Sequence, residues 1–477
     1  MLYEITPDKL KEECGVIGIY NGNRSENVAK SLYYGLYALQ HRGQESAGIA
    51  TGDGIQAGFH KEMGLVPEVF SEEVLKRLKG HIGIGHVRYS TTGDSNAVNA
   101  QPLVVRYRGG YIALAHNGNL VNAAELRDRL EEEGVIFQTT IDSEVIVNLI
   151  ARFSRDGIAN AIEKTMDMIR GSYALVVMTG EYLIGIRDPY GLRPLCLGKM
   201  ENGYVLASES CALDVIGAEF VRDVEPGEII IIGREGLLTK QVQPKCRRAS
   251  CIFEYIYFAR PDSVLDGTSV YEARRNAGRI LAEEHPVEAD LVISVPDTSI
   301  PAAIGYAEVS GIPFGEGLIK NRYVGRTFIQ PEQKLRETAV RLKLNALRHI
   351  VSGKRIVMID DSIVRGTTSR QIVSSLRMAG VKEVHLRISS PPVAYSCYFG
   401  IDTPTRSQLI GAVKTIEEIR EEIGADSLGY ISIEGLIRSV GKPAGHLCLA
   451  CFSGAYPMDV PEEGNKMVFE SNTGVLV

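Results

Sequence analysis

Residues 355–369 place side chains suited to phosphate and cation binding directly after a strand. Four apolar residues, 356–359, predict a buried strand, and Asp360 and Asp361 follow at its carboxyl end, where open α/β sheets bind ligands. A helical pattern over 370–378 comes next, so the intervening loop would offer backbone N–H groups and a positive dipole end to phosphate. Two carboxylates here suit ribose hydroxyls or magnesium, although a surface turn with two acids at a helix entry is the alternative. The loop carries small and polar residues: Arg365, Gly366, Thr367, Thr368 and Ser369.

The whole stretch resembles the binding motif for 5-phosphoribosyl-1-pyrophosphate (PRPP) in the type I phosphoribosyltransferases, an α/β fold. The resemblance implies that Asp360 and Asp361 bind the ribose and that residues 365–369 surround the 5′-phosphate, with PRPP and Mg²⁺ as expected ligands. A second polar turn follows a predicted strand at 291–295 and resembles the pyrophosphate loop of that family, with Thr298 aligned to a magnesium position beside the two aspartates. A helix cap at this turn is compatible with the same residues.

Residues 320–331 predict a loop with three cationic side chains among glycine and aromatic residues. A solvated charged loop is one interpretation, and a lid that closes over an anionic substrate is the other. The phosphoribosyltransferases have a flexible loop here, so the resemblance makes Lys320 and Arg326 candidates for binding the leaving pyrophosphate. Closure would matter because the anomeric carbon of PRPP develops oxocarbenium character, and water would capture it in place of ammonia.

The composition predicts a globular protein of two domains. A chain of 477 residues, 44% hydrophobic and 23% charged, is too long for one ordinary core. The formal net charge of -7 argues against general nucleic-acid binding, so cationic sites should be local phosphate pockets. No apolar run approaches the ~18 residues of a membrane span, and the N-terminus lacks the apolar core of a signal peptide. We therefore expect a cytoplasmic protein without nucleic-acid or membrane partners, whose eight cysteines are buried, catalytic or metal-bound rather than disulfide-bonded.

In the first half, polar side chains repeatedly follow apolar runs, which is how a pocket is built. Residues 14–20, CGVIGIY, predict a short strand that starts at Cys14, a residue that also suits simple burial. The segments that repeat this pattern are 32–49, 83–93, 114–122 and 140–146. Taken singly, their polar residues have ordinary interpretations, namely an ion pair at a strand edge for Arg88, a helix N-cap for Asp142, and an Asn-Gly hairpin turn for Asn117 and Gly118.

In this order, the segments resemble the glutaminase domain of the class II glutamine amidotransferases, whose fold is the N-terminal-nucleophile αββα sandwich. The resemblance covers residues 14 to about 242 and implies that residues 1–13 are a propeptide, removed by self-cleavage to free the α-amino group of Cys14. Hydrolysis of the glutamine amide needs a nucleophile, a proton shuttle and an oxyanion site, and an α-amino group with a pKa of about 7.7 to 8.0 can act as base for its own thiol. The residues implied for the site are Arg88 for the α-carboxylate of glutamine, Asp142 for its α-amino group, and Asn117 with the Gly118 N–H for the oxyanion hole.

A basic polar stretch, 245–250, predicts the domain boundary, with a glutaminase domain at 14–246 and a phosphoribosyltransferase domain at 247–477. Cys448 and Cys451 form a C-x-x-C pair, which alone indicates a redox pair, half of a zinc site or packing. One propeptide-bearing branch of the family carries a [4Fe-4S] cluster, and the ligands of that cluster match four cysteines here. Because four thiolates also suit zinc, the identity of the metal rests on the resemblance. The matching residues are Cys251, Cys397, Cys448 and Cys451.

Together the two halves resemble the glutamine PRPP amidotransferase family over nearly the whole chain. The resemblance implies that glutamine is cleaved at Cys14 and that ammonia passes inside the protein to PRPP, giving 5-phosphoribosylamine, glutamate and pyrophosphate in the first step of purine synthesis. It also implies a homotetramer inhibited by purine nucleotides. Two alternatives are another class II amidotransferase, against which the PRPP motif speaks, and a non-catalytic PRPP-sensing regulator, which would have no use for the glutaminase residues.

Overall fold

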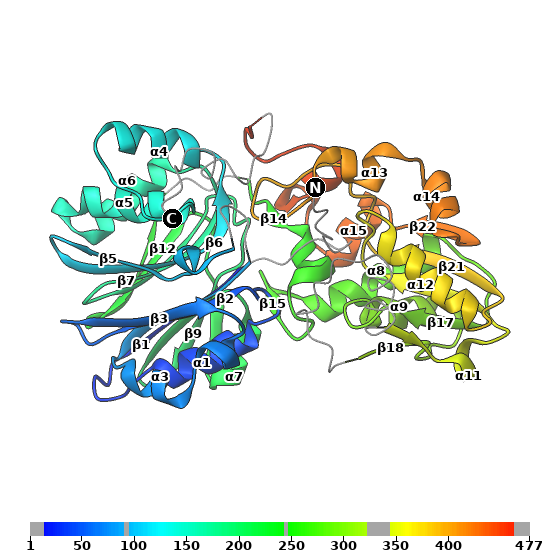
Figure 1. Ribbon diagram of the computed structural model, residues 1–477, viewed down its shortest axis with the longest axis horizontal. Coiled ribbons are helices and arrows are strands. Elements are labelled where there is room, and N and C mark those ends of the chain that lie inside the picture. The colour runs from blue at the N-terminus through cyan, green and yellow to red at the C-terminus, as the bar shows by residue number, and fades with distance from the viewer. Residues whose placement is uncertain (1–13, 90–94, 243–246, 322–343, 462–477) are drawn as a thin grey trace.

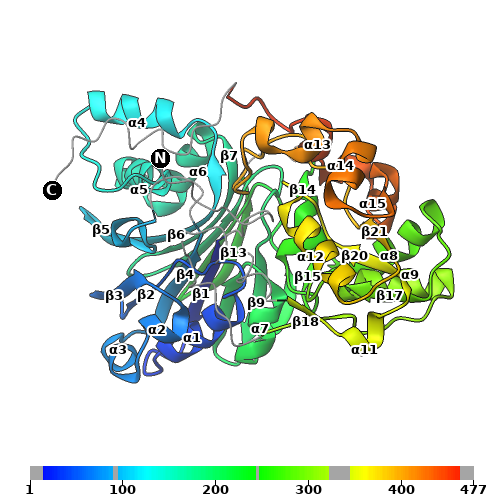
Figure 2. The same cartoon turned by 45° about the vertical axis from the view of Figure 1, so that its right-hand side comes forward.

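The computed structural model describes residues 14–89, 95–242, 247–321 and 344–461, which form two halves lying side by side (Figure 1). Turning the molecule by 45° shows the sheets of the first half beside the helices of the second (Figure 2). The predicted propeptide at 1–13, the lid residue Arg326 and the boundary residue 246 lie outside the described residues, so these predictions stand untested.

The first half contains two antiparallel sheets packed face to face. The first runs in the order β11 (Glu219–Asp223), β9 (Cys196–Met200), β10 (Gly203–Ala207), β1 (Gly15–Asn21), β4 (Ile82–Arg88), β2 (Ser46–Gly52) and β3 (Ala57–Met63). The second runs in the order β13 (Gly236–Gln241), β12 (Glu228–Gly233), β8 (Leu183–Arg187), β7 (Gly171–Met178), β6 (Gly110–Leu120) and β5 (Leu103–Tyr107).

Strand periodicity explains how the layers form. In β1, Ile17 and Ile19 face the helices α1 (Ala29–Ala38) and α7 (Ser210–Ile216), while Val16 enters the core between the two sheets. Gly18 allows the sheets to approach, because a Cβ there would lie 2.5 Å from Cγ1 of Val176. The outer face of the second sheet is covered by α4 (Ala123–Glu132), α5 (Ser143–Phe153) and α6 (Ile158–Met168). The αββα sandwich predicted from the sequence is therefore confirmed.

The second half is built on a parallel sheet with helices on both faces. Its strands run in the order β17 (Leu291–Ser294), β20 (Arg355–Asp360), β21 (Glu383–Ile388) and β22 (Ser427–Tyr430). One face packs against α8 (Val270–Glu284), α9 (Ile300–Ser310) and α15 (Ile433–Val440), and the other against α12 (Thr367–Met378) and α14 (Ile416–Ile423). Burial on both faces explains the unbroken apolar run in β20. The α/β architecture predicted for this half is confirmed.

Shorter elements complete the described chain. In the first half they are α2 (Val66–Val69), α3 (Glu72–Arg77), and the 3₁₀ turns η1 (Ala97–Asn99) and η2 (Ser154–Asp156). In the second half they are β14 (Ser250–Cys251), the π-helical turn η3 (Glu254–Phe258), β15 (Val264–Leu265), β16 (Thr268–Ser269), β18 (Leu318–Lys320), β19 (Leu344–Ala346), α11 (Arg348–Val351), η4 (Arg406–Gln408), α13 (Ile410–Val413), η5 (Ala444–His446), β23 (Leu447–Cys448) and α16 (Ala450–Ser453). Within the described ranges, no helix is both long and apolar enough to cross a bilayer.

Candidate active sites

The nucleophile candidate Cys14 lies immediately before β1, which pairs with β4 so that Gly15 faces Val87 and Cys14 comes beside the end of β4. The Cys14 thiol is buried and donates to the carbonyl of Tyr89 at 3.4 Å. Burial raises the pKa of this thiol to about 11, a rise that the charge of nearby Arg88 partly offsets. The thiol is therefore protonated at neutral pH and needs a base before it can attack an amide.

Arg88 and Asp142 supply opposite charges around Cys14, and both influence the pKa of its thiol. Asp142 precedes α5, but it caps no N–H of that helix; its Oδ2 instead accepts from the Leu120 N–H at 2.9 Å. Burial would raise the pKa of Asp142, but the charge of His116, 3.6 Å away, and several hydrogen bonds lower it below its usual value. A buried carboxylate that stays charged suits an ammonium group. Asp142 does occupy the N-cap position of α5, but its side chain makes no capping hydrogen bond there.

Asn117 and Gly118 lie inside strand β6, where Asn117 pairs with Ala174 and Gly118 with Tyr173. The alternative of an Asn-Gly hairpin turn is therefore wrong. Among the described residues, the buried Nδ2 of Asn117 has no hydrogen-bond partner, an arrangement that leaves a donor available for a ligand. Gly118 has φ +148°, and a Cβ would lie 2.1 Å from the carbonyl oxygen of Ser172, so only glycine fits.

Two histidines beyond the predicted site residues also lie here, His86 on the face of β4 between the sheets and His116 on the face of β6 toward α5. The Nε2 of His86 is 3.0 Å from the carbonyl oxygen of His116, which links β4 to β6. Burial lowers the pKa of His86 to about 3, so its ring is neutral at physiological pH. The Nδ1 of His116 lies 3.0 Å from the Ser143 hydroxyl beside Asp142. The available signal was that each histidine lies within two residues of Arg88 or Asn117, but both stand in largely apolar runs, which are typical of the core.

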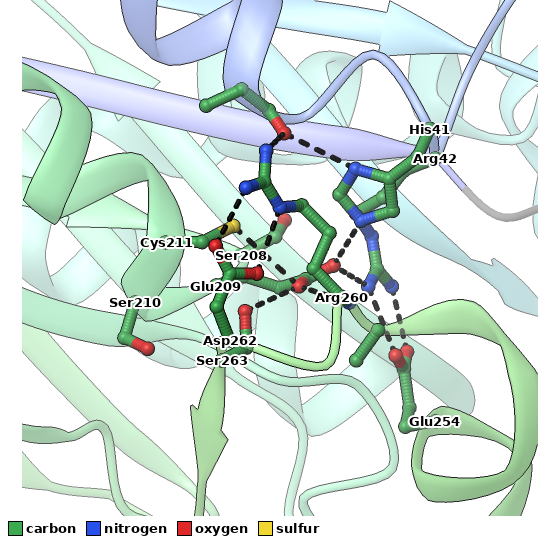
Figure 3. Close-up of polar contacts among 12 residues, drawn as sticks. His41, Arg42, Ser208, Glu209, Ser210, Cys211, Glu254, Arg260, Asp262 and Ser263 are labelled. Atoms are coloured by element: carbon green, nitrogen blue, oxygen red, sulfur yellow. Dashed lines mark hydrogen bonds and ion pairs between the residues drawn. The ribbon is translucent and has the colours of Figure 1, made fainter. Parts of the chain in front are cut away.

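Arg42 connects the Cys14 region to the second half of the chain, and Figure 3 shows its contacts with Glu254. It lies in the loop after α1 and is fully buried, and its Nε donates to the carbonyl of Cys14 at 3.1 Å. Its two terminal nitrogens bind both carboxylate oxygens of Glu254, at 2.9 and 2.6 Å, and one of them also binds Glu209 at 2.6 Å. Because Glu254 begins η3, one guanidinium spans both halves.

The charges in this network stabilise one another. Burial would lower the pKa of Arg42, but the carboxylates of Glu254 and Glu209 raise it above its usual value. Burial would likewise raise the pKa of Glu209, but His41 and Arg42 lower it well below its usual value. Glu209 also accepts from the Ser263 hydroxyl at 2.6 Å and from the Arg260 N–H at 2.9 Å. Removing one partner from such a buried pair typically costs about 3–5 kcal/mol.

In the second half, neighbouring parallel strands bring the proposed ribose and magnesium residues together. Asp360 ends β20 and Asp361 follows it, and the turn with Thr298 follows the adjacent β17. The Thr298 hydroxyl donates to Oδ2 of Asp361 at 2.5 Å, and the Ser299 hydroxyl lies 3.4 Å from Oδ1 of Asp360. Both aspartates are 1% exposed. The ends of two strands thus form one acidic site.

The predicted phosphate loop leads straight into helix α12, which begins at Thr367, earlier than the pattern at 370–378 suggested. Gly366 is the N-cap residue of α12 and has φ +82°, a left-handed conformation that glycine adopts readily. The chain therefore turns directly into the helix, and the N–H groups of the first turn of α12 face the loop. Thr367 is exposed and Thr368 half-buried, whereas the predicted contact residue Ser369 is 2% exposed. Arg365 donates to Oε1 of Gln408 at 2.9 Å.

Lys320 is half exposed at the end of β18 and forms an ion pair with Asp297 at 2.8 Å. Asp297 belongs to the same turn as Thr298, so Lys320 reaches the rim of the acidic site. Of the two lid candidates, Lys320 is the one that lies in the described chain, and it contacts the turn predicted to bind pyrophosphate.

The four cysteines that lie far apart in the sequence line one cavity of about 20 Å³, together with Arg193 and Phe399. The parallel pair β14 and β23 aligns two of them, Cys251 opposite Cys448. Burial raises the pKa of each of these two thiols to about 12. Among the described residues, no three His, Cys, Asp or Glu side chains form a group that could hold a single metal ion.

Comparison with known proteins accounts for both sites in one chain. A family model for a glutamine amidotransferase domain matches residues 86–215. The amidophosphoribosyltransferase of Archaeoglobus fulgidus is 54% identical over 94% of this chain and 99% of its own length, and that of Bacillus subtilis is 52% identical over 95% and 96%. The chain belongs to the amidophosphoribosyltransferase family. The prediction of a glutamine-dependent enzyme that acts at the first step of purine biosynthesis is thereby confirmed.

Solved structures of this family share the fold over nearly the whole chain. The Bacillus subtilis glutamine PRPP amidotransferase complexed with ADP and GMP matches with a TM-score of 0.89 and 52% identity, covering 94% of this chain and 98% of that one. A structure described as the allosteric regulatory enzyme of purine biosynthesis matches with a TM-score of 0.91 and 51% identity, covering 97% of this chain and 100% of that one.

Proposed function

We propose that this chain hydrolyses glutamine at Cys14 and transfers the ammonia to PRPP at the Thr298 and Asp361 site. The observation that carries the proposal is the buried Asn117 amide, whose donor has no partner in the described chain, on β6, which packs against the strand β1 that follows the buried Cys14 thiol. Such a donor serves an oxyanion that forms only during reaction. Arg88 would bind the α-carboxylate of glutamine and Asp142 its α-amino group.

The base for Cys14 would be its own α-amino group, freed when residues 1–13 are removed. Supporting this, the thiol is protonated at neutral pH, since burial raises its pKa to about 11. His86, on the strand that pairs with β1, is a poor base, because burial lowers its pKa to about 3. An α-amino group has a pKa of about 7.7 to 8.0, which suits proton transfer near neutral pH.

In the second half, PRPP would bind with its ribose at Asp360 and Asp361 and its 5′-phosphate at the N-terminal end of α12. Asp360, Asp361 and the Thr298 hydroxyl would hold Mg²⁺, which would supply positive charge for the pyrophosphate. Oxygen ligands of this kind suit magnesium. Lys320, at the rim, would contribute positive charge to the leaving group, with Arg326 as the second candidate.

The four cysteines would hold a [4Fe-4S] cluster that ties the C-terminal segment to the rest of the enzyme. Convergence of four thiols from distant segments supports such a ligand set, and the choice of iron-sulfur over zinc rests on the family resemblance. A cavity of about 20 Å³ holds roughly one water, so the thiols would move apart on binding. Anaerobically purified protein should contain about four irons per chain; zinc or no metal would contradict the proposal.

Inhibition by purine nucleotides and assembly into a homotetramer are further parts of this proposal. The relative from Bacillus subtilis was solved with ADP and GMP, which supports nucleotide binding. Size-exclusion chromatography with light scattering would give the subunit number, and titration of GMP against initial rate would test inhibition.

The deciding experiment counts glutamate and pyrophosphate released in one reaction with glutamine, Mg²⁺ and PRPP. Equal amounts that depend on both substrates would support coupled transfer, and glutamate alone would indicate a different acceptor. Cys14→Ala should abolish glutamine use and retain PRPP-dependent use of free ammonia. Glutamine activity unchanged by this substitution would refute the role of Cys14. If neither product forms, intact mass would reveal whether residues 1–13 are still attached.

A further inference from the structure

A loop of the second half, Tyr398–Gly400, contacts the strand that carries the oxyanion residues. The side chain of Asn119 donates from Nδ2 to the carbonyl of Tyr398 at 3.0 Å. The hydroxyl of Ser172 donates to the carbonyl of Phe399 at 2.7 Å and accepts from the Asn119 N–H at 3.1 Å. Two first-half strands, β6 and β7, are therefore tied to one loop from a segment more than two hundred residues away.

The contact reaches the oxyanion peptide itself through two glycines. Gly400 has φ +102°, and a Cβ there would lie 3.2 Å from the carbonyl carbon of Gly118 and 3.4 Å from its Cα. On its other side, Gly118 is limited by the carbonyl oxygen of Ser172, 2.1 Å from where its own Cβ would be. The backbone at Gly118 is thus confined between Ser172 and Gly400, with room for no side chain on either glycine.

The loop is itself held from outside the glutamine site. Arg193, from the first half, donates to the carbonyl of Phe399, and both residues line the cavity of the four cysteines. Cys397 precedes the loop, and its backbone N–H donates to the Thr403 hydroxyl at 2.8 Å. The loop therefore has fixed ends and is able to impose a position on the strand that it contacts.

We propose that Tyr398–Gly400 is a positioning element of the glutaminase, which orients the Gly118 N–H and the neighbouring Asn117 amide toward the glutamine carbonyl. The proposal rests on the function proposed above for those two residues. The phosphoribosyltransferase half thereby completes the oxyanion site of the other half. Glutamine hydrolysis, but not the reaction of PRPP with free ammonia, depends on this loop.

Gly400→Ala tests the proposal in the full-length enzyme. The added methyl group would lie 2.9 Å from Nη2 of Arg193, which itself binds Phe399, and 3.2 Å from the carbonyl carbon of Gly118, so the loop and the Gly118 backbone must separate by a few tenths of an ångström. Displacements of about 1 Å at a catalytic group typically cost ~10²-fold in rate, so a smaller loss is expected here. We expect kcat with glutamine to fall at least tenfold, with KM for glutamine within about twofold and ammonia-dependent activity retained. Gly441→Ala is the matched control, because Gly441 also has a positive φ of +70° but no atom within 4 Å of its Cβ position.

Ser172→Ala provides a second variant without a new clash, since it removes only the hydroxyl that bridges Asn119 and Phe399. It should show the same split between kcat and KM. The rate of Cys14 alkylation by iodoacetamide should match the wild type in both variants, because the nucleophile is untouched.

The possible outcomes separate the inference from the function on which it rests. A wild-type enzyme without glutamine-dependent synthesis would overturn the proposed function and this inference with it. An active wild type with Gly400→Ala and Ser172→Ala as active as Gly441→Ala would overturn the positioning role alone. Equal losses of glutamine- and ammonia-dependent activity would do the same, because they indicate a general structural defect.

Discussion

Substitution of Asn117 by alanine should separate catalysis from stability. If the amide is an oxyanion donor, its loss should reduce kcat for glutamine by about 10²–10³-fold, or roughly 3–4 kcal/mol of barrier. Its effect on the free energy of unfolding should be small, because two changes offset each other. The wild-type Nδ2 is buried without a partner in the described chain, which destabilises the fold by about 1–3 kcal/mol, and truncation removes that cost. The small cavity left by truncation costs a similar amount, on the order of 1–2 kcal/mol. The free energy of unfolding should therefore change by less than about 1 kcal/mol.

The assay measures glutamine- and ammonia-dependent consumption of PRPP side by side, together with urea unfolding of each variant. Asn148→Ala is the matched control, because Asn148, in α5, also has a buried Nδ2 with no partner among the described residues. It should share the small stability effect and keep full glutamine activity. A fall in glutamine kcat of less than about threefold for Asn117→Ala would refute the oxyanion assignment, as would a loss of both activities together.

Three further expectations concern the acidic site and the network around Arg42. Asp361→Ala should reduce glutamine- and ammonia-dependent synthesis alike, since both need PRPP; normal PRPP kinetics would count against its role. Glu254→Gln should lower the free energy of unfolding in urea by about 3–5 kcal/mol, because it leaves Arg42 without one buried carboxylate, and a change below about 1 kcal/mol would contradict this. Because the pKa of Glu209 is lowered in the folded state, its stabilising contribution is present above the unfolded value of 4.5 and is lost as pH falls through the folded value. Wild-type stability should accordingly decline more steeply than that of Glu209→Gln below about pH 4.5, and parallel curves would show that the shift is absent.

Some of the site was predictable because its residues are neighbours in sequence. Asp360 and Asp361 follow an unbroken apolar strand, and Gly366 precedes a helical pattern, so local rules place them at the end of β20 and at the start of α12. The order of the motifs along the chain likewise indicated the family. Roles that depend on position in a strand were harder. Asn117 and Gly118 have the composition of a hairpin turn, and only pairing with β7 put them inside a strand.

Local sequence therefore determined the strands, the helix starts and the types of side chain at their ends, because these depend on periodicity and backbone preference over a few residues. The tertiary structure decided which distant residues meet. Thr298 reaches Asp361 because β17 and β20 are adjacent, Arg42 binds Glu254 across the two halves, and Gly400 packs on Gly118. No spacing along the chain encodes these contacts. They arise when sheets and helices bury their apolar faces, and that burial is a property of the whole fold.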